Sequence, residues 1–181
     1  MGIPIGKMAL YTALGGLHHE NCLPVLLDVG TDNEERLANP IYIGWRQKRV
    51  RGAEYDDFIE TFVRAVEKRW PHVLLQWEDF AGSNAARLLK RYRNRLCTFN
   101  DDIQGTAAVV LATLLAAMKA ANTKLEEQRV AILGFGSAGI GIANLIVKAL
   151  MDGGLSEMDA KSRIYPLGRP GLLVEGAEGS H

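Results

Sequence analysis

Apolar and polar positions along the chain follow two patterns, short apolar runs bounded by turn residues and longer stretches with helical spacing. The clearest helix is predicted at residues 54–69, where apolar side chains recur every three or four positions (Tyr55, Phe58, Ile59, Phe62, Val63 and Val66). Other helices are predicted at residues 7–14, 84–95, 105–121 and 137–151. Strands are predicted at residues 24–30, 72–77, 96–99, 129–133 and 164–167. Because strands alternate with helices, the pattern predicts an α/β fold with parallel strands and flanking helices.

The helix predicted at residues 105–121 is rich in Ala and Leu, so we expect it to pack on two sides. No uninterrupted apolar run reaches about 18 residues, so no transmembrane helix is expected. The 21 basic and 21 acidic residues cancel, which argues against bulk attraction to nucleic acid or to an anionic membrane. The two cysteines form neither a disulfide framework nor a metal-type spacing, which indicates a reducing, intracellular compartment.

A glycine-rich turn, Gly134-Phe135-Gly136-Ser137-Ala138-Gly139, follows the strand at residues 129–133 and opens the helix at residues 137–151. In this strand–turn–helix–strand context, GxGxxG predicts the phosphate-binding turn of a Rossmann-type dinucleotide site. The first glycine allows the tight turn, the second lets the backbone approach a pyrophosphate, and the third lets helix and strand pack closely. Gly134, Gly136, Ser137, Ala138 and Gly139 are therefore candidate cofactor-binding residues. The alternative is an ordinary glycine turn.

The acidic residue that binds the ribose hydroxyls in many dinucleotide sites is missing from its expected place. After the strand at residues 164–167 the chain continues with Gly168 and Arg169. A neutral residue beside an arginine can accept a 2′-phosphate, which favours NADP, and Arg169 is then a cofactor-binding residue. If Arg169 is only a solvated loop residue, the site fits NAD equally well, so both cofactors stay open.

Two pairs of carboxylates follow predicted strands. Glu78 and Asp79 follow the strand at residues 72–77, and Asp101 and Asp102 follow the strand at residues 96–99. Side chains that leave neighbouring parallel strands at their carboxyl ends can converge, and an all-oxygen set suits Mg²⁺ or Mn²⁺ rather than Zn²⁺. The alternative is that these acidic residues cap the helices that follow.

Lys7 stands at the predicted start of the helix at residues 7–14. The helix macrodipole disfavours a cation there, which would lower the pKa of the lysine and suit a general base. A solvated surface lysine is the more common case for such a sequence, and both interpretations stay open.

Four stretches together closely resemble malic enzyme. They are residues 1–7 (MGIPIGK), 23–33 (LPVLLDVGTDN), 76–80 (QWEDF) and 98–108 (TFNDDIQGTAA). The resemblance implies oxidative decarboxylation of L-malate to pyruvate and CO₂, with NAD or NADP and with Mg²⁺ or Mn²⁺. It implies that Lys7 is the general base, that Glu78, Asp79 and Asp102 are the metal ligands, and that Asp101 lies behind them.

The resemblance also implies how the chain is organised. Residues 1–102 correspond to part of the catalytic, substrate- and metal-binding domain, and residues 103–181 to the start of the Rossmann-type dinucleotide-binding domain. A tyrosine acid and a substrate-binding arginine of the family lie upstream of this segment, and substrate-binding asparagines and further strands lie downstream. We therefore expect a fragment, truncated at both ends, with little or no activity alone. The full-length protein is expected to be a homo-oligomer in the cytoplasm, or in the mitochondrial matrix if it is eukaryotic.

Two other functions stay open at this point. A malolactic relative shares these motifs and releases lactate without net cofactor reduction. The second is a non-catalytic nucleotide- or metal-binding module that kept the scaffold. Charged groups such as Lys7 and Asp102 cost free energy to bury, so their retention argues against this module.

Overall fold

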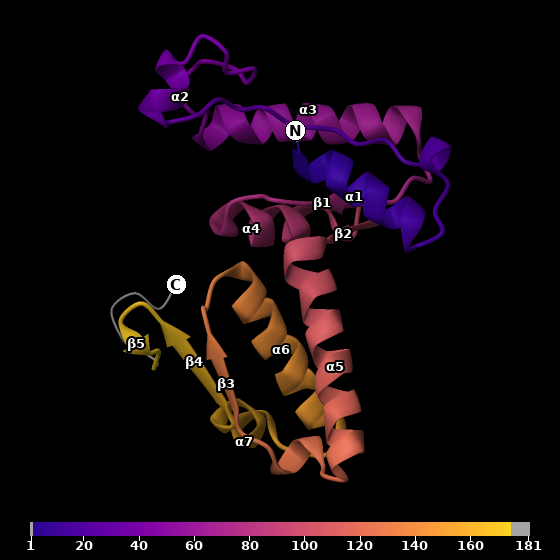
Figure 1. Cartoon of the computed structure of the whole chain (residues 1–181), viewed down its shortest axis with the longest axis vertical. Coiled ribbons are helices and arrows are strands. Elements are labelled where there is room, and N and C mark those ends of the chain that lie inside the picture. The colour runs from indigo at the N-terminus through magenta and orange to yellow at the C-terminus, as the bar shows by residue number, and fades with distance from the viewer. Residues whose placement is uncertain (1, 175–181) are drawn as a thin grey trace. The chain divides into compact units, whose positions relative to one another are not determined.

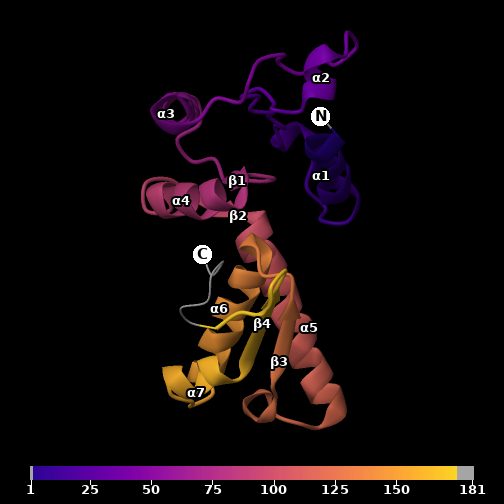
Figure 2. The same cartoon turned by 90° about the vertical axis from the view of Figure 1, so that its left-hand side faces the viewer.

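The computed structural model describes residues 2–174, and the chain forms two compact units, Met1–Ala65 and Val66–His181 (Figures 1 and 2). The first unit contains helix α1 (Gly2–Ala13), the short 3-10 helix η1 (His19–Asn21), helix α2 (Glu34–Ala38) and most of helix α3 (Gly52–Arg69). The parallel strands lie in the second unit. The predicted α/β fold with parallel strands is confirmed.

Helix α3 forms where the apolar spacing predicts it. Tyr55, Ile59, Val63 and Val66 are buried along one face, while Phe58 lies at the edge of this stripe and is exposed. The helix ends at Arg69, before a proline that cannot continue the backbone hydrogen bonds. Local periodicity therefore predicts this element almost completely.

The strand predicted for residues 24–30 does not form, and this prediction is wrong. A strand needs a partner for its backbone groups, and within residues 2–174 no strand pairs with this segment. Only Val29 and Thr31 make backbone hydrogen bonds to a second extended stretch, with Val50 N–H donating to Val29 O and Thr31 N–H donating to Gln47 O, both at 2.9 Å. The apolar run itself stays at the surface, since Leu26 is 55% exposed.

The second unit holds two small sheets. Strands β1 (Leu75–Trp77) and β2 (Thr98–Asn100) are parallel neighbours joined by helix α4 (Gly82–Tyr92). Strands β3 (Val130–Leu133) and β4 (Ile164–Gly168) are also parallel, and the short strand β5 (Gly171–Leu172) runs antiparallel to β4. The helical elements that follow β2 and β3 are the π-helical turn η2 (Asp101–Gly105), helix α5 (Thr106–Ala121), the 3-10 helix η3 (Leu125–Glu127), helix α6 (Ser137–Asp152) and helix α7 (Glu157–Ser162).

Two apolar clusters hold this unit together. Trp77 of β1 packs against Tyr92 of α4, with ring centroids 5.8 Å apart, and meets Phe80 edge to face at 5.3 Å. Ile146 and Leu150 of α6 form a second cluster with buried residues of η3 and α7. Trp77 is the last residue of β1 and Phe80 follows Asp79, so the first cluster flanks Glu78 and Asp79 in the sequence.

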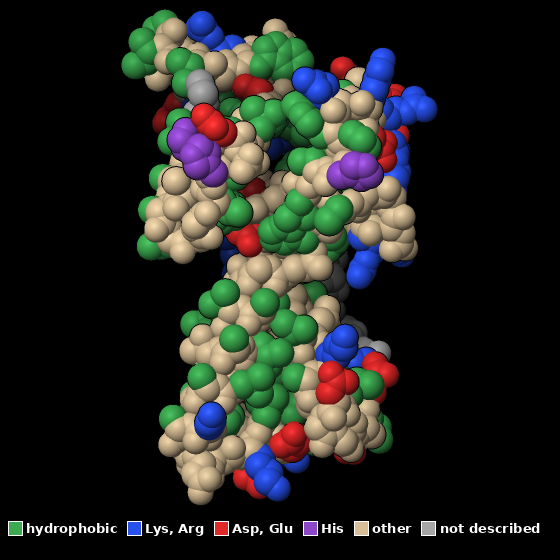
Figure 3. Space-filling view, turned by 90° about the vertical axis from the view of Figure 1, so that its right-hand side faces the viewer, with side chains coloured by type: hydrophobic (Ala, Val, Ile, Leu, Met, Phe, Trp, Pro, Cys, Tyr) green, Lys and Arg blue, Asp and Glu red, His purple; other side chains and the backbone are tan. Residues whose placement is uncertain are grey.

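Helix α5 differs from its predicted packing. It packs against α6 (Figure 1), but within the described residues its only buried residue is Ala107, and Val109 is 67% exposed. Two-sided packing is therefore wrong for the part of the chain that the structure describes, and apolar side chains gather on the surface of this unit (Figure 3).

Among residues 2–174, Asp101–Ala121 is the one helical segment long and apolar enough to cross a membrane by length and composition. Core helices of globular proteins meet the same test, so this indication is weak.

Candidate functional site

The two acidic pairs lie at one edge of the small sheet formed by β1 and β2. Trp77 of β1 is in register with Asn100 of β2, so each pair begins one residue beyond the last paired position. We call Glu78, Asp79, Asp101 and Asp102 the carboxylate edge. One contact joins its two halves, a hydrogen bond in which the Asp79 backbone N–H donates to Asp102 Oδ2 at 2.8 Å. The structure therefore brings Asp79 and Asp102 together across 23 residues of sequence.

The other two carboxylates point to different partners. Gln76 Nε2 donates to Glu78 Oε2 at 3.1 Å, so Glu78 lies beside the residue two positions earlier on its strand. Asp101 folds over its own turn, because a Cβ added to Gly105 would lie 2.0 Å from Asp101 Oδ1. Within residues 2–174, no three His, Cys, Asp or Glu side chains lie together as a group able to hold a metal ion. Asp79 and Asp102 are thus close, while Glu78 and Asp101 make contacts within their own strand end and turn.

Helix capping does not explain these carboxylates. The N-cap of α4 is Ala81, which makes no side-chain cap bond, so neither Glu78 nor Asp79 caps that helix. The turn η2 is capped by Asn100, whose Oδ1 accepts a hydrogen bond from Ile103 N–H at 2.9 Å. Asp79 has a left-handed backbone (φ 59°), which only a minority of non-glycine residues adopt. The set of carboxylate oxygens at two strand ends fits Mg²⁺ or Mn²⁺ by its donor chemistry.

Asn100 lies directly before Asp101 and is not among the site residues predicted from the sequence. It is fully buried, and its backbone N–H donates to Gln104 Oε1 at 3.0 Å. Asn100 and Gln104 together hold the π-helical turn that carries Asp101 and Asp102. The available signal is an asparagine placed directly before the first turn of a helix, where N-caps are common.

The glycine turn between β3 and α6 has the geometry expected of a phosphate-binding turn. Gly134 has φ +93°, a left-handed conformation that favours glycine. A Cβ at Gly136 would meet no atom within 4 Å, so its backbone is open to an approaching ligand, whereas a Cβ at Gly139 would lie 2.3 Å from Gly134 O. Ser137 and Ala138 begin α6, whose N-cap Gly136 supplies no side-chain acceptor. The first N–H groups of this helix therefore have no intrahelical acceptor, as at known anion sites.

A cavity of about 700 Å³ lies between this turn and the end of β4. Its lining includes Leu133, Gly136, Gly168, Arg169 and Leu173. Gly168 is the last residue of β4, and Arg169 lies at the exposed tip of the hairpin to β5. The cavity thus places the arginine and the glycine turn around one space, and no carboxylate of residues 2–174 lines it.

The carboxylate edge and the glycine turn belong to one unit, and the elements that carry them approach each other closely at two glycines. A Cβ at Gly82, the first residue of α4, would lie 2.8 Å from Ser137 Oγ. A Cβ at Gly141 of α6 would lie 2.5 Å from Ile103 O in the turn η2. Glycine at both positions lets the start of α6 approach the ends of β1 and β2.

Lys7 lies on α1 in the other unit. The helix begins at Gly2 rather than at Lys7, so Lys7 lies mid-helix and is half-buried. The predicted helix start is therefore wrong, and the macrodipole argument for a general base fails with it, because that effect is confined to the first turn. Gly2, Pro4 and Gly6 explain the error, because glycine and proline usually mark a turn, although proline is also favourable in the first turn of a helix.

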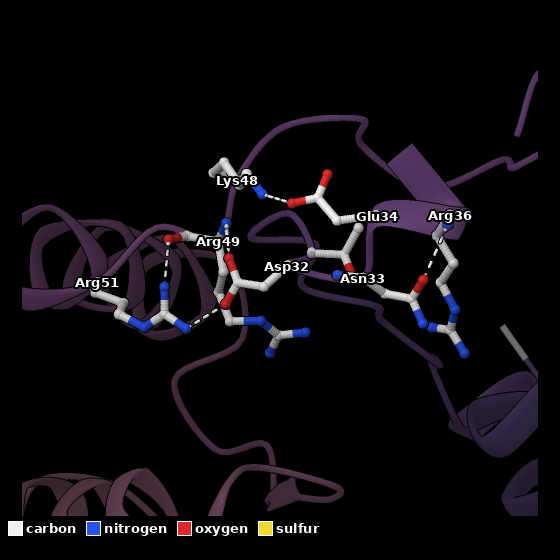
Figure 4. Close-up of polar contacts among 8 residues, drawn as sticks. Asp32, Asn33, Glu34, Arg36, Lys48, Arg49 and Arg51 are labelled. Carbon is white, nitrogen blue, oxygen red and sulfur yellow. Dashed lines mark hydrogen bonds and ion pairs between the residues drawn. The ribbon is translucent and has the colours of Figure 1, made fainter. Parts of the chain in front are cut away.

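Ion pairs and hydrogen bonds in the first unit join residues 32–34 to residues 48–51 (Figure 4). Asp32 accepts hydrogen bonds from the Arg51 guanidinium and, at 3.1 Å, from the Arg49 backbone N–H. The Arg51 hydrogen bond is the main cause that holds the pKa of Asp32 below its usual value, and the Arg49 bond adds to it. Lys48 and Glu34 form a second ion pair beside it. These contacts hold the loop at residues 28–34, part of one motif that resembles malic enzyme.

We predict that this unit loses stability in acid through Asp32. Because the folded pKa of Asp32 lies below that of the unfolded chain, its contribution is full above the unfolded pKa, about 4, and falls as pH drops through the folded pKa. Asp32→Asn should therefore unfold at lower urea concentration than wild type at neutral pH, with the difference shrinking below about pH 4. Circular dichroism during urea titration at several pH values measures this.

The matched control is Asp57→Asn, which removes an exposed carboxylate from α3 of the same unit. An equal pH dependence of the two variants would show that the Asp32–Arg51 pair contributes nothing specific.

Comparison with known proteins gives one consistent result. Residues 1–93 match the family model for the malic enzyme N-terminal domain, and residues 103–180 match the model for the malic enzyme NAD-binding domain. An NAD-dependent malic enzyme of Aliivibrio fischeri is 58% identical over 176 residues, which cover 97% of this chain and 31% of the relative. NAD-dependent malic enzyme 2 of Photobacterium profundum is 55% identical over 178 residues, covering 98% of this chain and 32% of the relative. The chain thus spans about a third of the length of these relatives.

Solved structures agree with this. The crystal structure of NAD-dependent malic enzyme from Thermotoga maritima aligns with a TM-score of 0.54 at 30% identity, covering 71% of this chain and 31% of that one. The Entamoeba histolytica malic enzyme aligns with a TM-score of 0.64 over 96% of this chain and 30% of that one, and at 24% identity it supports the fold alone.

Proposed function

Because this chain belongs to the malic enzyme family, we propose that the full-length protein oxidatively decarboxylates L-malate to pyruvate and CO₂ and reduces NAD or NADP. Residues 1–102 are its partial catalytic domain and residues 103–181 its partial dinucleotide-binding domain. The observation that carries the proposal is the contact of Asp79 with Asp102 in the same unit as the glycine turn. A metal-bound hydroxy acid and a nicotinamide have to meet for hydride transfer, and the close contact of Gly82 with Ser137 supports their proximity.

The proposed roles follow from the chemistry of the carboxylates and, for Lys7, from the resemblance to the family. Glu78, Asp79 and Asp102 hold Mg²⁺ or Mn²⁺ by carboxylate oxygens, and Asp101 keeps the turn behind them in place. A bound divalent cation supplies a Lewis acid that acidifies the malate hydroxyl and stabilises the charge left by CO₂. Lys7 would accept the hydroxyl proton at Nζ, and bound NAD or NADP would supply the acceptor for the hydride of C2. The C3–C4 bond then breaks, CO₂ leaves, and C3 takes a proton to give pyruvate.

The relatives also bear on compartment and assembly. The similar curated proteins quoted above are bacterial, which supports a cytoplasmic location for the full-length protein. A homo-oligomer is proposed from the family resemblance alone.

The 181-residue chain alone should show little or no turnover. It spans 31% of the Aliivibrio relative, so about two thirds of the length of that relative has no counterpart in it. Malate-dependent NAD(P)H absorbance with Mn²⁺ measures this, and turnover comparable to a full-length relative would contradict it. Assaying the full-length protein for NAD(P)H against lactate separates the oxidative reaction from the malolactic one.

Metal binding tests the carboxylate edge directly. We expect the chain to bind Mn²⁺ and Asp102→Asn to bind it at least about tenfold more weakly, because a ligand charge is lost. Asparagine keeps an oxygen that can accept the Asp79 N–H bond, so the variant changes charge more than structure. Titration followed by electron paramagnetic resonance of free Mn²⁺ measures the dissociation constant.

Asp152→Asn, at the exposed end of α6, is the control for general loss of negative charge. Absence of Mn²⁺ binding by the wild-type chain would favour the non-catalytic module over a metal site.

The cofactor preference is the finer part of the proposal. NAD is supported by the names of the relatives, whereas the Gly168–Arg169 pair favours acceptance of the 2′-phosphate of NADP. We propose that the site accepts both cofactors. An acidic residue at position 168 would repel the phosphate, and its Cβ would also press on Leu173 Cδ2 at 3.2 Å.

Arg169→Ala should weaken NADP binding about three- to tenfold and leave NAD nearly unchanged, because an exposed arginine–phosphate contact is modest in energy. Isothermal titration calorimetry with both cofactors measures this. Arg129→Ala is the matched control, since Arg129 is an exposed arginine directly before β3, while the glycine turn follows that strand. Equal losses for NAD and NADP in Arg169→Ala would contradict recognition of the 2′-phosphate.

A further inference from the structure

The side chain of Asn100 is buried at the end of β2 with its amide oriented by one hydrogen bond. Asn100 has no exposed surface. Its Oδ1 accepts from Ile103 N–H at 2.9 Å, and a flipped amide would place two donors against each other there. Nδ2 therefore points away from the Ile103 N–H.

Nδ2 has no hydrogen-bond partner within residues 2–174. A buried donor without an acceptor is unfavourable and uncommon in native proteins. The capping role does not require it, because Ser and Asp cap helices about as well as Asn and carry no amide N–H. The amide donor therefore needs an explanation other than the cap.

The groups nearest in sequence are acceptors. Asp101 and Asp102 follow Asn100 directly, and Glu78 follows Trp77, the register partner of Asn100 on the parallel strand. An ionised carboxylate has about four lone-pair sites, so an oxygen that binds a cation can accept a further hydrogen bond. Carboxylates that bind metals are commonly oriented by such hydrogen bonds.

We propose that Asn100 is a positioning residue of the cation site. Its Oδ1 holds the turn that carries Asp101 and Asp102, and in the cation-loaded protein its Nδ2 donates to a carboxylate oxygen of the carboxylate edge. This inference rests on the proposed function, because it requires a divalent cation at that edge. The competing explanation is that Asn100 only caps the turn and avoids a third adjacent negative charge.

Two substitutions separate these explanations. Asn100→Ser keeps a cap acceptor and removes the amide donor, while Asn100→Asp keeps size and cap and replaces the donor by an acceptor. We expect Asn100→Ser to raise the Kd for Mn²⁺ by about 10- to 100-fold, as for other residues that orient metal ligands. Asn100→Asp adds a negative charge that by itself favours a cation, so a raised Kd in this variant as well would show that loss of the donor outweighs the added charge. Ser156→Ala is the control, because it removes the cap of α7, where Ser156 Oγ accepts from Asp159 N–H at 3.1 Å. It should lower the melting temperature without changing Mn²⁺ affinity.

A second readout needs no variant. In a spectrum of ¹⁵N-labelled wild-type chain, the Asn100 side-chain amide protons should move downfield on addition of Mg²⁺, as expected when an amide gains a carboxylate acceptor. Amide signals that stay unchanged at saturating Mg²⁺ would overturn the positioning role, even if the variants fail to fold.

The outcomes also separate this inference from the metal site itself. Mn²⁺ binding by wild type with unchanged affinity in Asn100→Ser would show that Asn100 is only a cap, while the carboxylate site stands. Absence of Mn²⁺ binding by wild type would remove both.

Discussion

The parallel pairing of β1 with β2 is the constraint on which the candidate site depends. Each strand has three residues, and the register of Trp77 with Asn100 sets the two acidic pairs beside each other. Parallel neighbours end at the same edge of a sheet, whereas an antiparallel pair would send the two acidic pairs to opposite edges. The buried contact of Trp77 with Tyr92 holds the connecting helix against this pair, and the Asp79–Asp102 hydrogen bond is the result.

Close backbone packing links this edge to the glycine turn. Gly82, Gly139 and Gly141 each stand where a Cβ would come within 3 Å of another atom. These contacts let α6 approach both the turn after β3 and the turn after β2. One helix thus supports the candidate phosphate site at its first residues and the carboxylate turn through Gly141. A larger side chain at Gly141 would have to displace the Ile103 backbone, and with it the turn that carries Asp102.

The sequence predicts elements whose pattern is local, and it places the acidic pairs and the glycine turn each at the ends of strands. Helix α3 and helix α6 follow from apolar spacing and from the glycines before α6. Strand β3 is short but lies between clear turn signals, and it also forms as predicted. The strand at residues 24–30 fails because an apolar run becomes a strand only where a partner satisfies its backbone.

Amino-acid sequence by itself thus determined which chemical groups are present and which elements carry them, because periodicity, caps and glycine turns act within a few residues. Only the tertiary structure decided that Asp79 meets Asp102, that Glu78 lies with Gln76, and that Asn100 is buried with its amide donor unpaired among the described residues. Only it decided that α5 leaves apolar side chains exposed. The physical reason is that burial and hydrogen-bond partners depend on which distant segments pack together. The sequence therefore identifies the candidate ligands of the carboxylate edge, and only the tertiary structure shows how they are arranged.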